Sequence, residues 1–233
     1  MTENIYPLSN FNFNNDVSTI FDKHVRDSIP FYDEIQKNMV LLSDYFLTKN
    51  SVFYDLGCST GETLFNILTR HKSKDIVFYG IDTSEHMLKQ AYLKLPKNDD
   101  VVLIQDDILS FVMPQKSDLV VLNLVLHFIP KEMRFDLIKK IQINMNKGSA
   151  LIIVDKCFAS SSQFQYMFDC SYHDLKEIQG LTNDEIRKKE QSIRGVLTPF
   201  YIEDYLNIFS QLNLKSEVFY KNFGFTGFIC IKD

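Results

Sequence analysis

A glycine-containing turn directly after an apolar strand is the feature that most constrains the fold of this chain. In SVFYDLGCSTGETLFNIL, residues 51–68, Gly57 and Gly61 stand four positions apart. The run before Gly57 is β-branched and aromatic, and apolar residues recur at helical spacing after Gly61. Glycine lets a ligand approach the main chain and adopts torsion angles that other residues resist. The segment therefore predicts a strand, a ligand-binding turn and a helix.

Strand and helix patterns alternate through the following hundred residues. Because the strand-like runs are continuously apolar and are separated by helical segments, they favour a mostly parallel sheet covered on both faces. The expected fold is α/β, a Rossmann-like doubly wound sheet of seven strands. The further strand-like runs are IVFYGID (76–82), VVLIQDDI (101–108), SDLVVLNLVLHF (117–128) and GSALIIVDKC (148–157), the last following a helix stop at Gly148.

The two ends of the chain depart from this alternation. Residues 1–45 predict one or two helices broken at Pro30, which we call the N-terminal cover. Residues 159–199 predict a helical insertion, which we call the lid, placed to close a site at the carboxyl edge of the sheet. A helix in YIEDYLNIFSQLN and two closing strands in KSEVFYKNFGFTGFICIKD follow. We expect one domain over residues 1–233.

Composition narrows the class of protein. The formal net charge of −5 gives no overall attraction to nucleic acid or to an anionic membrane. No apolar run reaches the length of a membrane span, and the first residues lack a signal-peptide pattern, so a cytoplasmic protein is expected. The cysteines have no metal-binding spacing, and we expect reduced thiols and no metal site. They are Cys58, Cys157, Cys170 and Cys230.

Acidic residues at successive strand ends indicate the ligand. The dinucleotide fingerprint needs a third glycine that DLGCSTG lacks, and Asp55 places a carboxylate where a dinucleotide carries phosphate. A carboxylate suits a cation such as S-adenosylmethionine (SAM). Asp82, about 25 residues on, is placed to accept both ribose hydroxyls. Asp107 and Ile108 are candidates for the adenine amino group and the adenine face.

The motifs YDLGCSTGE, GIDTS, QDDI and VVLNLVLHF occur in the order found in class I SAM-dependent methyltransferases, which this chain resembles over roughly residues 50–156. That resemblance implies the fold and SAM as cofactor. Nearly the whole chain is similar to one branch, the carboxy-S-adenosylmethionine synthases. The segments FDKHVRDSIPFYDEI, LHFIP, VDK, YHDLKEIQGLTNDEI and GVLTPF follow that family's order.

The resemblance also implies an activity. Members of the family convert SAM to a carboxymethyl sulfonium through an ylide, with prephenate as carboxyl source, for wobble-uridine modification of tRNA that they do not bind themselves. It implies a small-molecule substrate or SAM alone, no direct nucleic acid or membrane partner, and a homodimer. The implied cofactor-binding residues are Tyr32, Asp55, Gly57, Cys58, Ser59, Gly61, Asp82, Thr83, Asp107, Ile108 and Asn123.

One position departs from the family pattern. Members carry an arginine in the lid that pairs with the new carboxylate, and the ungapped match puts Glu190 there. A carboxylate at this position would repel a carboxymethyl product. Arg194 lies one helical turn later on the same face and is the candidate substitute, the alternative being a solvated Glu190–Arg194 pair.

Three reactions remain open at this point. They are carboxyl transfer, cyclisation of SAM to azetidine-2-carboxylate and methylthioadenosine, and conventional methyl transfer to a small nucleophile. A non-catalytic binding module is a further alternative. His127 follows the fourth strand, and a general base or a structural hydrogen bond are both open for it. Lid aromatics at Phe164, Tyr166, Phe168 and Tyr172 form either a sulfonium cage or packing. The catalytic candidates are Tyr32, Asn123, His127, Tyr172 and His173.

Overall fold

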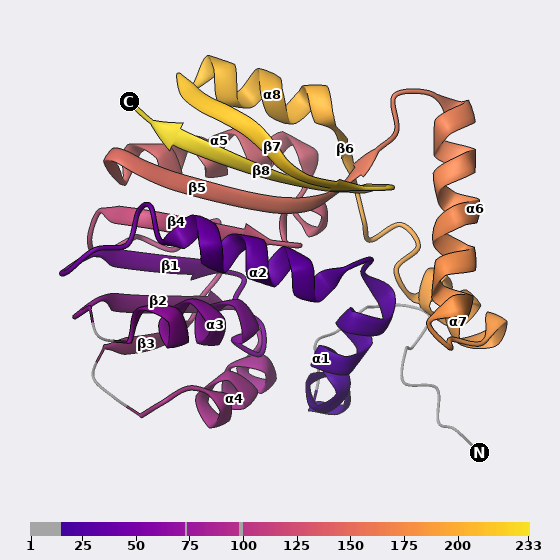
Figure 1. Cartoon of the computed structure of the whole chain (residues 1–233), viewed down its shortest axis with the longest axis horizontal. Helices are drawn as coiled ribbons and strands as arrows, with labels where there is room; N and C mark the ends of the chain where they lie inside the picture. The colour runs from indigo at the N-terminus through magenta and orange to yellow at the C-terminus, as the bar shows by residue number, and fades with distance from the viewer. Residues whose placement is uncertain (1–14, 73, 98–99) are drawn as a thin grey trace.

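A single mixed sheet forms the middle layer of the molecule, a computed structural model that describes residues 15–72, 74–97 and 100–233 (Figure 1). The strand order is β3-β2-β1-β4-β5-β8-β7. The first five strands are parallel, and β8 runs antiparallel to both of its neighbours. The expected doubly wound α/β fold is confirmed. The strands are β1 (Val52–Leu56), β2 (Val77–Asp82), β3 (Val101–Gln105), β4 (Ser117–Asn123), β5 (Met145–Phe158), β7 (Leu214–Asn222) and β8 (Phe225–Lys232), with the short β6 (Phe200–Tyr201) beside the end of β5.

Alternate side chains of the strands build two separate cores, one on each face of the sheet. Phe53 packs with one core and Tyr54 with the other, because successive strand residues point to opposite faces. One core takes side chains from α2 (Tyr32–Ser43), α3 (Glu62–His71) and α4 (Glu85–Lys94). The other takes them from α5 (Lys131–Ile143) and α8 (Ile202–Gln211).

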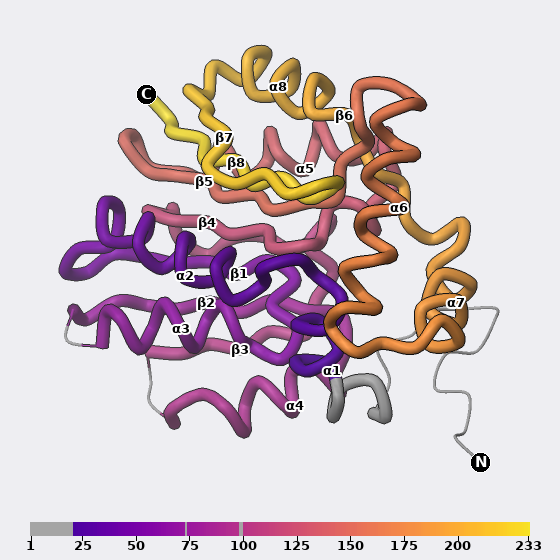
Figure 2. The backbone as a smooth tube through the Cα atoms, turned by 45° about the vertical axis from the view of Figure 1, so that its right-hand side comes forward, coloured from indigo at the N-terminus to yellow at the C-terminus, as the bar shows by residue number. Residues whose placement is uncertain are grey.

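The predicted cover and lid lie together beyond the carboxyl edge of the parallel strands (Figure 2). The cover contributes α1 (Asn15–Ser28) and the lid α6 (Ser162–Ile178) and α7 (Asn183–Ser192). Lys189 of the lid donates to the Ser28 hydroxyl at 2.9 Å, and Tyr172 of α6 donates to the Ser28 carbonyl. Tyr220 of β7 donates to the Pro30 carbonyl at 2.7 Å. Hydrogen bonds therefore join the two ends of the chain.

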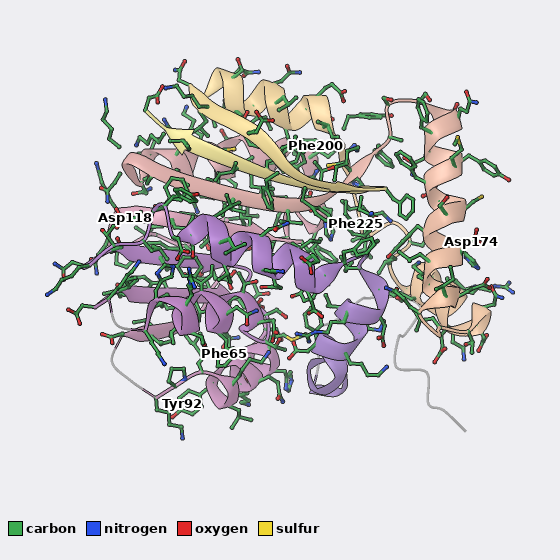
Figure 3. All side chains as sticks on the ribbon, in the orientation of Figure 1. Phe65, Tyr92, Asp118, Asp174, Phe200 and Phe225 are labelled. Carbon is green, nitrogen blue, oxygen red and sulfur yellow. The ribbon has the colours of Figure 1, made fainter. Side chains whose placement is uncertain are left out.

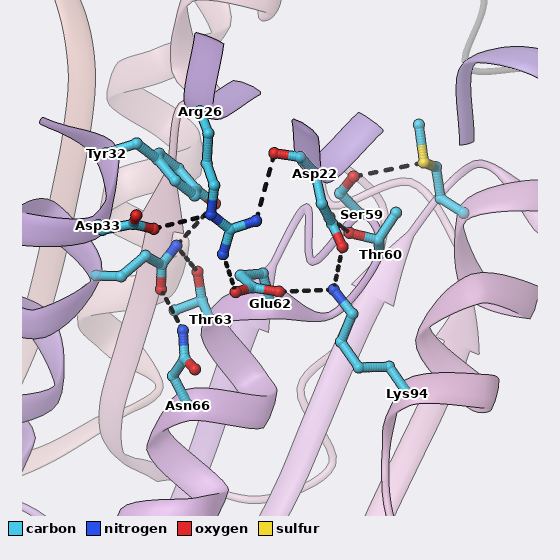
Figure 4. A network of polar contacts seen from close by, with 12 residues as sticks. Asp22, Arg26, Tyr32, Asp33, Ser59, Thr60, Glu62, Thr63, Asn66 and Lys94 are labelled. Atoms are coloured by element: carbon cyan, nitrogen blue, oxygen red, sulfur yellow. Dashed lines mark hydrogen bonds and ion pairs between the residues drawn. The ribbon is translucent and has the colours of Figure 1, made fainter. Parts of the chain in front are cut away.

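Ion pairs fasten α1 to the helices that begin at the sheet edge (Figure 4). Arg26 contacts Glu62 at 2.6 Å, and Lys94 contacts Glu62 at 2.7 Å and Asp22 at 2.6 Å. Thr60, in the turn after β1, donates to the same Asp22. The cover is thus bonded directly to the predicted ligand-binding turn.

Three predicted strand boundaries are wrong. The third strand ends at Gln105, three residues before the predicted end at Ile108. The fourth strand ends at Asn123 instead of continuing through Phe128, because Leu124 has a φ of +61° and a 3₁₀ turn, η1 (Leu126–Phe128), follows. The fifth strand begins at Met145, so Gly148 lies inside it and is not a helix stop. The preceding helix ends instead at Ile143, where the Asn144 side chain donates to the Lys140 carbonyl at 2.8 Å.

No helix in the described ranges is long and apolar enough to cross a membrane, and no three His, Cys, Asp or Glu side chains in these ranges are grouped so that they could hold a metal ion. All four cysteines are free thiols, and Cys170 alone among them is exposed.

Arg134 of α5 is a fully buried cation that joins two loops at the site. Its guanidinium donates to the Ile129 carbonyl at 2.8 and 3.0 Å and to both oxygens of Thr198, and it lies 4.3 Å from the Phe200 ring centroid. The segment after η1 is thereby bonded to the segment that leaves the lid.

Replacing this cation should destabilise the fold. In Arg134→Met the Ile129 and Thr198 carbonyls lose the guanidinium donor, and we expect the free energy of unfolding to fall by about 2–4 kcal/mol. Urea denaturation measures the change. Lys139→Met, at an exposed position of the same helix, is the control and should change stability by less than about 0.5 kcal/mol. Equal stabilities of the two variants would contradict the role given to Arg134.

Candidate functional site

A cavity of about 620 Å³ lies between the carboxyl ends of the strands and the two helical segments above them. A volume of this size accommodates a ligand as large as SAM together with a second small molecule. Strand ends and turns form its floor, and α1, α2, α6 and α7 contribute its walls. The predicted residues that line it are Tyr32, Asp55, Gly57, Cys58, Ser59, Asp82, Thr83, Asp107, Ile108, Asn123, His127, Tyr172 and Glu190.

Three predicted residues lie outside the lining. Gly61 begins α3 with a φ of +75°, where a Cβ would meet that of Ala91 at 3.0 Å. His173 is directed to Asn183, whose side-chain oxygen lies 2.8 Å from its Nε2. Arg194 is exposed, and since α7 ends at Ser192, the expectation that it shares a helical face with Glu190 fails.

Of the two alternatives left open for the lid aromatics, the sulfonium cage is not assembled. Of its four members only Tyr172 lines the cavity, and Phe164 and Tyr166 are exposed. The Tyr172 ring lies 5.5 Å from that of Phe225, centroid to centroid. Figure 3 shows Phe225, the first residue of β8, on the side that faces the lid.

The conformation of the turn after β1 requires a glycine at position 57. Gly57 has a φ of +81°, and a Cβ there would lie 2.5 Å from a methyl carbon of Val125. The amides of Gly57 and Cys58 donate to the Ile81 carbonyl at 2.8 and 2.9 Å. These bonds hold the turn against the end of β2, so the main chain itself forms part of the cavity wall.

Asp82 is oriented by backbone amides. Its two carboxylate oxygens accept from the amides of Ser59 and Ser84, each at 2.9 Å. Burial raises the pKa of Asp82. Each carboxylate oxygen keeps a second lone pair, so the residue fits two ribose hydroxyls. Asp107 accepts from the Leu109 amide at 2.9 Å beside the buried Ile108, which leaves a polar and an apolar group next to each other at the end of β3.

Two buried oxygens in the floor of the cavity lack partners among the described residues. They are Oδ2 of Asp55 and Oδ1 of Asn123, on the neighbouring strands β1 and β4. Burial first, and the charge of Asp82 second, raise the pKa of Asp55 to about 7. An unpartnered buried acceptor is costly, and a cationic ligand removes that cost. These residues therefore fit the ammonium end of SAM.

A hydrogen-bonded chain of side chains links the cover to this floor. Gln36 donates to the Tyr32 hydroxyl at 2.8 Å and to the Thr63 hydroxyl at 3.0 Å, and Asn123 donates to the same Thr63 at 3.2 Å. Sequence reasoning missed Gln36 and Thr63. The placement of Gln36 four residues after Tyr32 on one helix was the available signal.

The lid side of the cavity carries three lysines, of which Lys156 belongs to the VDK segment and the other two were not singled out from the sequence. Lys156 lies near the end of β5, Lys176 on α6 and Lys189 on α7. Lys176 is 4% exposed and stands 4.0 Å from the Tyr172 ring centroid. Lys189 also shares a hydrogen bond with Nε2 of His24.

These lysines are poorly neutralised. Burial lowers the pKa of all three, and burial followed by repulsion from the other two lowers that of Lys189 to about 7. Among the residues that the structure describes, Glu190 is the only carboxylate within 4.0 Å of any of them, at 3.6 Å from Lys176. Three buried cations with a single carboxylate in contact indicate that a further anion belongs between them.

Comparisons with known proteins give the class. A family model described as a methyltransferase domain matches residues 54–151. The plantazolicin methyltransferase BpumL bound to SAH superposes with a TM-score of 0.66 at 13% identity, covering 94% of this chain and 92% of that chain. Magnesium protoporphyrin IX methyltransferase from Synechocystis PCC 6803 with bound SAH gives 0.58 at 19% identity, covering 94% and 97%. The fold is that of the class I methyltransferases.

Similarity to one group of proteins extends along the whole chain. The carboxy-S-adenosyl-L-methionine synthase of Desulfotalea psychrophila is 31% identical, covering 99% of this chain and 95% of the relative. That of Staphylococcus epidermidis is 34% identical, covering 91% and 92%. This chain belongs to the carboxy-S-adenosyl-L-methionine synthase family. It is a SAM-binding enzyme that acts on SAM, so the resemblance identified in the sequence is confirmed.

The turn should not tolerate a side chain at Gly57. In Gly57→Ala the Cβ collides with Val125 and the residue is held in the left-handed region, which costs about 1–2 kcal/mol even without the collision. We expect the dissociation constant for SAM, measured by calorimetry, to rise at least about 100-fold. Gly195→Ala is the control, because Gly195 has a φ of +76° but no atom within 4 Å of its Cβ position. Equal effects would rule out the collision as the cause.

Asp55 should make SAM binding pH-dependent. Because its pKa is raised to about 7, the carboxyl group is protonated at pH 6 and must lose that proton when a cation binds. Affinity for SAM should therefore rise with pH up to about 7, by at most about tenfold per pH unit, and then level off. Calorimetry in buffers of different ionisation enthalpy counts the released proton.

Two variants assign that proton. Asp55→Asn should bind SAM more weakly and abolish the release at pH 6. Lys189→Met removes the other nearby group whose pKa is about 7 and should preserve the release. Undiminished release from the Asp55 variant would show that another group titrates.

Proposed function

We propose that the enzyme carboxylates SAM at its S-methyl group, with an anionic carboxyl donor held by Lys156, Lys176 and Lys189. The segregation of charge within one cavity carries this proposal. Carboxyl groups line the strand ends at Asp55 and Asp82, where the cationic SAM fits, whereas the opposite, lid side carries three ammonium groups against two carboxylates, those of Asp169 and Glu190. The synthase names of the relatives from D. psychrophila and S. epidermidis support the same reaction.

The lysines supply the positive charge that the missing arginine would have provided. Glu190, at the arginine's position, is directed to Lys176, and its side chain is 52% exposed. Its negative charge is therefore offset by an adjacent cation and by solvent. Two further ammonium groups remain for the carboxylates of the donor and of the product.

The overall reaction balances with prephenate, the carboxyl source implied by the family resemblance. Prephenate loses carbon dioxide and its ring hydroxyl group to become phenylpyruvate. The S-methyl group loses a proton and gains the carboxyl group, and the proton and the hydroxide form water. No nucleic acid takes part in this reaction.

A second candidate is the cyclisation of SAM to azetidine-2-carboxylate and methylthioadenosine. Glu190 is the observation that favours it, because a carboxylate in the cavity lining disfavours a carboxymethyl product. The reaction needs a neutral α-amine aimed at the γ-carbon, and no second substrate.

Mass spectrometry of the purified enzyme incubated with SAM, first alone and then with prephenate, separates the candidates. Carboxylation gives a heavier sulfonium only in the second tube. Methylthioadenosine in the first tube would replace the proposal with cyclisation. S-adenosylhomocysteine would indicate methyl transfer to a small acceptor.

Removing one lysine should affect the donor and not SAM. Lys189→Met exchanges a buried ammonium group for an apolar group of similar volume, which buried sites tolerate. We expect the KM for prephenate to rise at least about tenfold and the SAM dissociation constant to stay within about twofold. The neighbouring Lys188→Met, whose ammonium group is exposed and paired with Asp184 at 2.7 Å, is the control and should leave both constants unchanged. An unchanged KM in Lys189→Met would remove this lysine from the donor site.

A further inference from the structure

A buried hydrogen-bonded series of three side chains ends at the cavity. Nδ1 of His127 bonds Oδ1 of Asp155, and the hydroxyl of Tyr205 bonds Oδ2 of the same carboxyl group. The backbone amide of His127 also donates to Oδ1, at 3.2 Å. Asp155 and Tyr205 are fully buried, whereas His127 lines the cavity. Three elements, η1, β5 and α8, contribute one residue each.

The bonding pattern decides which nitrogen of His127 carries the proton. An ionised carboxylate only accepts hydrogen bonds, so Nδ1 must be the donor to Asp155. Nε2 of the neutral ring then holds a lone pair, and within the described part of the chain no side chain or amide bonds it. Burial and the neighbouring Asp155 raise the pKa of Tyr205, which keeps its proton and donates it to the carboxylate.

We propose that His127 accepts the proton that the S-methyl group of SAM loses, with its imidazole oriented by Asp155 and the Asp155 carboxylate held by Tyr205. This inference rests on the proposed carboxylation. An aspartate that fixes the tautomer of a histidine is an established way to present a proton acceptor. His127 is the catalytic residue here, and Asp155 and Tyr205 are positioning residues.

The proton transfer completes the balance of the reaction. The methyl C–H bond breaks, its proton forms an N–H bond at Nε2 of His127, and its electron pair forms the new C–C bond to the carboxyl carbon. The bond between that carbon and the donor's ring breaks, and its electron pair makes the ring aromatic and expels the ring hydroxyl group. The histidinium then returns the proton to the hydroxyl group that leaves the donor, which departs as water. No oxidant or further reactant is needed.

The place of Asp155 along β5 fits this order of events. Lys156 is the next residue, and its ammonium group belongs to the lysine set on the lid side. Asn123, whose Oδ1 is unpartnered, ends the neighbouring strand β4, four residues before His127. His127, Asn123 and Lys156 therefore line the same cavity.

The tautomer can be tested without turnover. Long-range 1H–15N correlation spectra of protein with labelled histidine should show one ring protonated at Nδ1 and not at Nε2. The protein has 5 histidines, and the absence of that signal in His127→Gln assigns it. A His127 ring protonated at Nε2 in the wild type would overturn the inference, because that nitrogen could not accept a proton.

Kinetics test the role itself. In His127→Gln we expect kcat for the carboxymethyl product to fall about 10²–10⁴-fold, the usual contribution of a positioned base, while the SAM dissociation constant stays within about twofold. An unchanged kcat would overturn the inference and leave the proposed carboxylation standing. Absence of the product from the wild type would overturn the carboxylation, and this step with it.

Tyr205→Phe tests the positioning with a smaller change than the removal of the buried carboxylate. We expect kcat to fall at least about fivefold and the share of the Nδ1–H tautomer to fall with it. Tyr54→Phe is the matched control, because Tyr54 is also fully buried and loses a hydroxyl bond, to the Gln115 carbonyl at 3.0 Å, outside the cavity lining. If both variants lost stability and neither changed kcat or the tautomer, Tyr205 would be structural only.

Discussion

The site depends on one topological constraint, the reversal of strand order beside β1. The chain builds outward from β1 to β3 and then crosses back to place β4 on the other side of β1. Connections on the two sides of that point leave in opposite directions and open a crevice at the carboxyl edge. Asp55 is the last residue but one of β1 and Asn123 is the last residue of β4, the two strands that flank the crevice, so their unpartnered oxygens follow from the fold and not from local strain.

Sequence reasoning succeeded where the chemistry is local. The turn at Gly57 and the acids that follow β2 and β3 are each signalled within a few residues, and the structure brings them to one cavity. It failed where the site is assembled across long distances. Lysines 156, 176 and 189 stand on three elements, and in a helix a lysine predicts a solvated face unless the neighbouring element is known. The prediction that Arg194 shares a helical face with Glu190 was wrong because helix ends are poorly specified by pattern alone.

The same physical cause shifts the pKa values of the groups at the two ends of the cavity in opposite directions. Removal from water raises the pKa of Asp55 and lowers that of Lys189, both to about 7. With a pKa near 7, the side chains of Asp55 and Lys189 can each be neutral while no ligand of opposite charge is bound. Each side chain becomes charged when such a ligand binds. The electrostatic free-energy cost of the empty cavity is therefore small. Binding is most favourable when a cation and an anion are present at the same time.

The bonds between Ser28 and the residues Tyr172 and Lys189 carry a consequence for biosynthesis. The N-terminal cover leaves the ribosome first, the sheet edge next and the lid near the end. A nascent chain that has reached β4 already holds the acids for SAM, but it cannot enclose a ligand until the lid has been translated and has met the cover. Closure of the cavity therefore comes only after the five parallel strands have been translated.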